Sequence, residues 1–123
     1  MSMSYGVVWQ EGTLPPGIGK LELLPRAFSL EGLADSRPVG REVPYEGLVG
    51  VRVGRTSAER INGRPTVVVE PRRGLPISIA TVDRPSLVGE IVERLSALVL
   101  RSKEAVEWPL RPVEKSGASA TTG

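Results

Sequence analysis

Arginine is the residue type whose spacing in this chain favours a specific chemistry. The 123 residues include thirteen Arg and three Lys, and Asp and Glu bring the net charge down to +2. A guanidinium donates two parallel hydrogen bonds to a phosphate or a carboxylate, so converging arginines favour an acidic ligand. Six arginines lie close together in the sequence: Arg52, Arg55, Arg60, Arg64, Arg72 and Arg73.

Convergence of this arginine cluster depends on the loops that carry it. Arg72 and Arg73 occupy the tip of a predicted hairpin, where side chains are free to meet a ligand. The cluster converges if the loop at 55–64 and the turn at 71–74 lie at the same end of the sheet. The alternative interpretation is a solvated surface in a protein whose composition favours arginine.

Two residue types that are absent limit the reactions this chain could catalyse. The sequence has no His and no Cys, which removes the commonest general base, the thiol nucleophile and the preferred ligands of zinc. The glycine-rich segment 12–19 lacks the Lys-Ser/Thr pair of a phosphate-binding loop. Glu11, Glu22 and Glu31 show no spacing typical of a glycosidase pair. We therefore expect a protein that is not an enzyme and that uses no cofactor and no metal.

The two tryptophans are candidates for exposed anchors at an interface, where Trp is enriched. The alternative is that Trp9 caps the core and Trp108 packs beside the end of a helix. The arginine cluster contains no aromatic residue on which a base could stack, so nucleic acid binding is not expected.

Alternating apolar residues predict short strands through the first two thirds of the chain. Tyr5, Val7 and Trp9 fall on one face of the first strand, for example. Segment 33–40 is interpreted as a polar connection, and Asn62-Gly63 as a turn. One short strand is predicted within residues 1–10, and the others span residues 20–24, 27–31, 41–44, 48–54, 66–70 and 75–82.

The hydrophobic period then changes from two to 3.6, which predicts an amphipathic helix over 85–101. Gly89 within it is expected to permit close approach to a strand. The fold class is therefore mainly β: an antiparallel barrel or sandwich of about seven strands, capped by a C-terminal α-helix. The apolar stripe of the helix consists of Leu87, Val88, Ile91, Val92, Leu95, Leu98 and Val99.

One domain is expected over 1–108, followed by a disordered tail over 109–123, which is poor in apolar residues. No apolar run approaches the roughly 18 residues that span a bilayer, and the first ten residues do not read as a secretory signal. These features predict a cytoplasmic protein.

Several segments carry a resemblance to a known superfold. They are Gly19–Leu23 leading into Phe28–Leu30, then Pro44–Val51, Pro65–Glu70 and the helix from Pro85. In this order the chain resembles the pleckstrin-homology (PH) superfold, and more narrowly the small bacterial PH-like and GRAM-like domains. A different small β-barrel with a terminal helix, or an α+β sandwich, is the alternative.

The resemblance implies a non-catalytic module that binds a protein or peptide partner, including a second copy of itself. The contact surface would be a free strand edge or a groove beside the helix. A second hypothesis is binding of acidic lipid head groups or phosphate ligands by the arginine cluster, with peripheral contact to an anionic membrane. Arg37 and Arg41 form a smaller basic pair, whose spacing does not match the Lys-x-Arg type of motif in lipid-binding PH domains. A catalytic domain is the third hypothesis.

Overall fold

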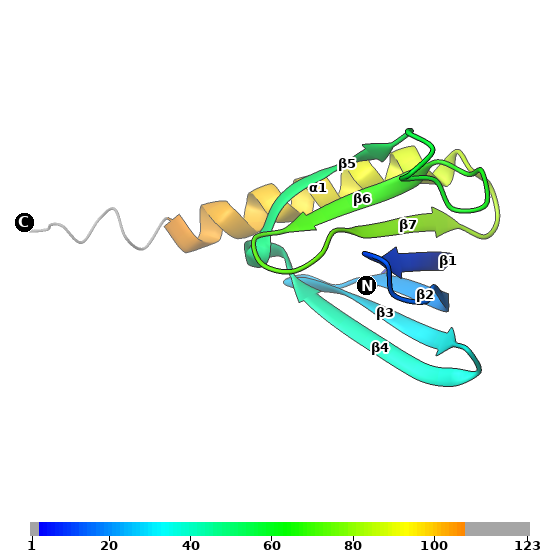
Figure 1. The fold of residues 1–123 in the computed structure, drawn as a ribbon. Helices are drawn as coiled ribbons and strands as arrows, with labels where there is room; N and C mark the ends of the chain where they lie inside the picture. The colour runs from blue at the N-terminus through cyan, green and yellow to red at the C-terminus, as the bar shows by residue number, and fades with distance from the viewer. Residues whose placement is uncertain (1–2, 108–123) are drawn as a thin grey trace, which may run out of the picture.

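The structure is a computed structural model that describes residues 3–107 (Figure 1). Its strands form one antiparallel sheet in the order β4-β3-β2-β1-β7-β6-β5, which confirms the predicted mainly β class with a C-terminal helix. The elements are β1 (Met3–Glu11), β2 (Gly17–Leu23), β3 (Ala27–Ala34), β4 (Arg37–Pro44), the short helix η1 (Tyr45–Gly47), β5 (Leu48–Gly54), β6 (Thr66–Pro71), β7 (Ile77–Thr81) and α1 (Leu87–Glu107).

The sheet bends into two wings that enclose the core (Figure 1). One wing holds β1 to β4, and the other holds β5 to β7 with α1 packed on it. Strands β4 and β5 are the two edges of the sheet and do not pair with each other. The core forms where the alternating inward residues of both wings meet, as Tyr5, Val7 and Trp9 show for β1, and most of its members are Val, Leu and Ile.

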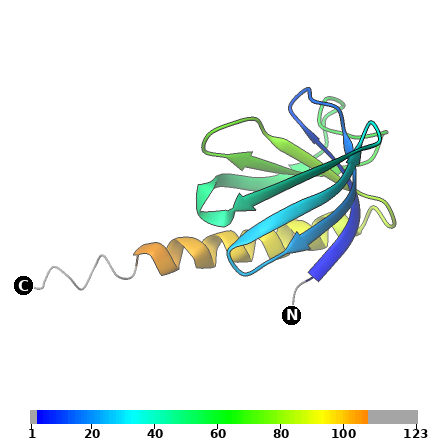
Figure 2. The ribbon, with the colours of Figure 1, turned by 90° about the horizontal axis from the view of Figure 1, so that it is seen from below.

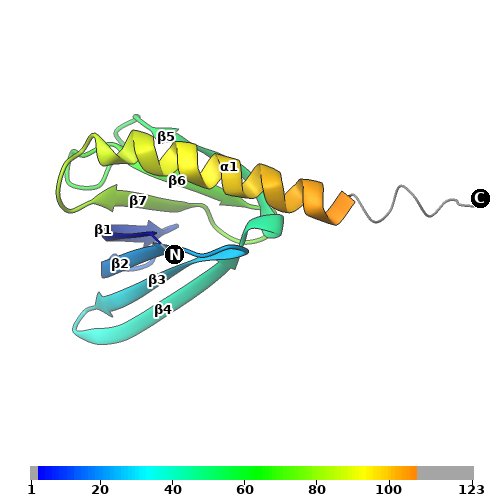
Figure 3. The same cartoon turned by 180° about the vertical axis from the view of Figure 1, so that it is seen from behind.

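The helix α1 closes one end of this core by lying across β5 and β6 (Figure 3). Val88, Ile91 and Leu95 are buried at its centre, and the other four residues of the predicted stripe are half-buried beside them. Full burial of such a side chain stabilises the fold by roughly 1.5–3 kcal/mol. Tyr5 adds a polar link, because its hydroxyl donates to Glu90 Oε2 over 2.9 Å.

Some predicted boundaries of α1 and β7 are wrong. The helix begins two residues later than predicted and continues to Glu107, where no further apolar stripe marks it. Gly89 is exposed, and a Cβ there would meet nothing within 4 Å, so it serves no close approach to a strand. Leu75 precedes β7 and is 48% exposed. The predicted tail at 109–123 and Trp108 lie outside the described residues.

The predicted polar connection at 33–40 is also wrong. Strand β3 continues to Ala34, and β4 begins at Arg37 after a two-residue turn. Asp35 and Ser36 form that turn with φ of 52° and 64°, the left-handed pair that suits a tight hairpin. The first half of β4, residues 37–40, escaped prediction because β4 is an edge strand in which only Val43 is buried. The predicted turn at Asn62-Gly63 is confirmed, with φ of 53° and 76°.

A close contact between two backbones shapes β2 and β3. Gly19 and Gly32 lie directly opposite each other on the inner face of the sheet. A Cβ on Gly19 would come within 1.9 Å of the Glu31 carbonyl oxygen, and one on Gly32 within 2.0 Å of the Ile18 carbonyl oxygen. Neither position admits a side chain without separating the strands.

We expect Gly19→Ala to lower the free energy of unfolding by roughly 1–3 kcal/mol, because the added methyl overpacks this contact. Gly40→Ala is the matched control, since the nearest atom to its Cβ is the Leu30 carbonyl oxygen at 3.8 Å. It should change stability by less than about 0.5 kcal/mol. Urea denaturation of both variants measures the difference, and equal losses would contradict the steric explanation.

Candidate functional site

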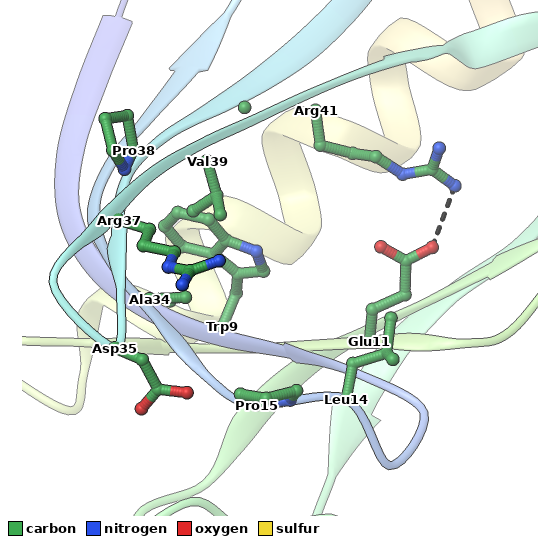
Figure 4. A pocket seen from close by; sticks show the side chains of 12 residues that line it. Trp9, Glu11, Leu14, Pro15, Ala34, Asp35, Arg37, Pro38, Val39 and Arg41 are labelled. Carbon is green, nitrogen blue, oxygen red and sulfur yellow. Dashed lines mark ion pairs between the residues drawn. The ribbon is translucent and has the colours of Figure 1, made fainter.

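A large hollow opens at the end of the sheet where the inner residues are small. It has a volume of about 680 Å³ and lies between the end of β1, the loop at 12–16, the start of β2 and the hairpin of β3 and β4 (Figure 4). We call this hollow the Trp9 groove. The loop after β1 projects on the side of the molecule away from α1 (Figure 2). The groove is therefore not covered by the helix.

The groove exists because Gly17 and Gly19 place no side chains on the inner face of β2 at this end. Trp9 pairs with Gly17, and its indole occupies the space above that residue. A Cβ on Gly17 would lie 2.5 Å from indole atom Cζ2. Trp9 is 7% exposed, so it caps the core, as one sequence interpretation held, and also lines the groove.

The rest of the lining combines apolar surface with arginine. Leu14, Pro15 and Val39 supply apolar surface, and Leu14 is 52% exposed. Arg37 is exposed, and its side chain makes no ion pair or hydrogen bond with another described residue. Arg41 reaches across the groove from β4 to Glu11 at the end of β1, with Nη2 2.9 Å from Oε2 (Figure 4). The groove can therefore hold an apolar group beside an acidic one.

A second hollow of about 310 Å³ continues along β4. It lies between the second half of β4, residues 41–44, and the turn after β6 that carries Arg72 and Arg73. We call it the Arg72 hollow. Arg41 lines both hollows. The turn itself is anchored to the short helix η1, because the Arg72 amide donates to the Gly47 carbonyl oxygen over 2.7 Å.

The condition for convergence of the arginine cluster is not met. The loop at 55–64 precedes β6 and the turn at 72–76 follows it, so they lie at opposite ends of that strand (Figure 1). Arg72 and Arg73 are exposed at one end, and Arg55 is exposed at the other. None of these three side chains is bonded to another described residue.

The side chains of the other three arginines of the cluster bond to other residues of the same chain. Arg52 pairs with Glu59 over 2.5 Å and lies 3.8 Å from Glu70. Arg60 donates to the carbonyl oxygens of its own loop, and Arg64 Nη1 donates to the Thr81 carbonyl oxygen over 2.8 Å. These contacts tie the loop at 55–64 to the sheet. They give these arginines a structural role.

The pair between Arg52 and Glu59 has a measurable electrostatic signature. Its hydrogen bond lowers the pKa of Glu59 from 4.5 to about 2, with a further contribution from Thr56. A lowered pKa stabilises the folded loop above pH 4.5, and that contribution is lost as the pH falls toward about 2.

We therefore expect the Glu59 carboxyl to titrate near pH 2 in an NMR titration of the folded protein, provided the fold persists at that pH. In the Arg52→Gln variant its midpoint should move back toward 4.5, because the main hydrogen-bond donor is gone. The matched control is Arg55→Gln, which should leave the midpoint near pH 2 because Arg55 is not among the groups that lower the pKa of Glu59. A midpoint near 4.5 in the unchanged protein would contradict this role of Arg52.

Sequence reasoning missed the Trp9 groove, although it named Trp9, Arg37 and Arg41 separately. The groove depends on the register that sets Trp9 beside Gly17 and on the bend that brings Glu11 to Arg41. Within residues 3–107 no cluster of three acidic, His or Cys side chains could hold a metal ion. Over the same range no helix combines the length and apolarity needed to cross a membrane.

Comparison with known proteins supports the fold. No family model matches the sequence, and no curated protein matches it. Among solved structures, the chain is similar to the C-terminal domain of an unknown protein from Leishmania infantum. The TM-score is 0.59 at 12% sequence identity, over 80% of this chain and 82% of the other. At that identity the likeness concerns the fold alone.

Proposed function

We propose that this chain is a non-catalytic, PH-like binding module that holds a peptide segment of a protein partner in the Trp9 groove. The observation that carries the proposal is the groove itself, with Trp9 on its wall and Arg37 and Arg41 beside apolar side chains. Its volume of about 680 Å³ falls within the range of roughly 300–1,000 Å³ that is typical of ligand sites.

The element order supports the PH-like part of the proposal. An antiparallel sheet of two wings is followed by one C-terminal helix that packs across it, as in the superfold that the sequence resembles. Fold alone does not set the ligand. The chemistry of the groove favours a segment with an apolar side chain next to an acidic group, since both can be satisfied there.

The test is selection of peptides from a random ten-residue display library against the purified protein. We expect Leu14→Asp to weaken binding of the selected peptides at least tenfold, because it places a carboxylate in the groove lining. Leu100→Asp makes the same change on α1, where Leu100 is 61% exposed, and should leave binding unchanged. Titration by fluorescence anisotropy measures both affinities.

Failure to enrich any peptide would count against the proposal, as would equal effects of the two variants. A second copy of this chain is one source of the segment. In that case sedimentation of the purified protein shows a concentration-dependent dimer, which Leu14→Asp should dissociate.

Acidic lipid head groups are a second candidate ligand, favoured by Arg72 and Arg73. Both are exposed and have no bonded partner among the described side chains, while Arg41 lines the same hollow. An anionic bilayer attracts such residues by roughly 1 kcal/mol each.

If this candidate is correct, the protein should pellet with vesicles of phosphatidylcholine and phosphatidylserine and stay in solution with phosphatidylcholine alone. Replacing Arg72 and Arg73 by Glu should abolish pelleting, whereas the charge-matched Arg84→Glu/Arg101→Glu variant should weaken it only slightly. Pelleting that persists at high salt, or that responds equally to both variants, would contradict a head-group site.

A further inference from the structure

We propose that the Trp9 groove and the Arg72 hollow are one channel whose ligand is an extended acidic peptide segment. This inference rests on the proposed function and names the class of partner. Its first support is continuity, because Arg41 lines both hollows and β4 borders both. Eight residues of an extended strand span about 26 Å, so the channel has the length of a short extended segment.

Positively charged arginine side chains line the channel from one end to the other. Arg37 and Arg41 project from β4 four residues apart, a separation of about 13 Å in a strand. Arg72 and Arg73 follow at the far end. The carboxylates among the same lining residues are Glu11, Asp35 and Glu42, and Glu11 is already engaged by Arg41. Free guanidinium groups are therefore available at both ends to a ligand with spaced acidic side chains.

The pair between Arg41 and Glu11 stands at the junction of the two hollows. Its side chains are 44% and 21% exposed, so water reaches the pair and screens it in part, which makes it a weak one. An acidic side chain of the ligand can take the place of Glu11 on Arg41 without leaving a buried charge. Glu11 then acts as an internal competitor for the acidic segment.

The edge of β4 limits how the segment is held. In a two-residue hairpin the residues flanking the turn form a hydrogen-bonded pair, here Ala34 and Arg37. Alternation then directs the backbone groups of Arg37, Val39, Arg41 and Val43 toward β3. The outward set is Pro38, Gly40, Glu42 and Pro44.

Two members of that outward set are prolines, which have no N–H to donate. Donation of backbone N–H groups along this edge is thus confined to Gly40 and Glu42. A full added strand, as the sequence analysis anticipated for a free edge, does not fit β4. Side-chain contacts with the arginines must therefore supply most of the recognition.

The probe is a fluorescent, capped ten-residue peptide with a central Leu and two Glu on each side, compared with its Gln counterpart. We expect the Glu peptide to bind at least tenfold more tightly than the Gln peptide. Arg72→Gln/Arg73→Gln should remove most of that preference, and Arg84→Gln/Arg101→Gln should preserve it. Glu11→Gln should tighten binding of the Glu peptide severalfold, since the internal competitor is neutralised.

The outcomes separate this inference from the proposed function. If Arg72→Gln/Arg73→Gln changes nothing while Leu14→Asp still abolishes binding of the display-selected peptides, the channel is overturned and the Trp9 groove stands. Equal binding of the Glu and Gln peptides, or weaker binding by Glu11→Gln, also overturns it. Binding to phosphatidylserine vesicles without binding of any peptide overturns both proposals.

Discussion

The direct opposition of Gly19 and Gly32 is the constraint on which the arrangement of this molecule depends. Because no side chain fits between those backbones, the inner face of β2 and β3 is bare at that level, while Leu21 and Leu30 fill the level below. Large side chains therefore fill the core at the end near α1, and few side chains fill the opposite end, which is the thin end of the core. Trp9 fills part of the thin end, and what it leaves open is the groove. The glycines at positions 17, 19 and 32 thus allow the strands to pack closely and also leave the space that forms the groove.

The sequence predicts best those elements that bury one face of side chains and expose the other. Tyr5, Val7 and Trp9 predict a strand correctly because they alternate with less buried residues, so that one face of β1 is buried and the other is not. The first half of β4 could not be predicted for the opposite reason, because all of its residues are exposed and no alternation of apolar and polar residues marks it. The last six residues of α1 extend past the predicted stripe, which ends at Val99.

The candidate site was harder to predict because closeness in sequence is a poor guide in antiparallel sheets. Successive loops along β5, β6 and β7 alternate between the two ends of the sheet, so Arg55 and Arg72 are carried apart. Distant residues are brought together instead, as Glu11 and Arg41 show. That contact depends on the curvature of the whole sheet, which no local pattern encodes. Three of the six arginines therefore bond to other residues of the protein, and the other three are exposed without such a bond to a described residue. Their spacing in the sequence does not predict which arginine belongs to which group.

The two-residue turn at Asp35-Ser36 has a further consequence. This turn and the loop at 12–16 form the walls of the groove, yet neither supplies a residue to the buried core. Substitution of an exposed lining residue such as Leu14 alters the opening at little cost to folding, whereas the left-handed backbone of Asp35 and Ser36 restricts the residues that the turn accepts. The residues that shape the opening are thus separate from the glycine contact and the helix that maintain the scaffold, so the groove can be redesigned while the core is left intact.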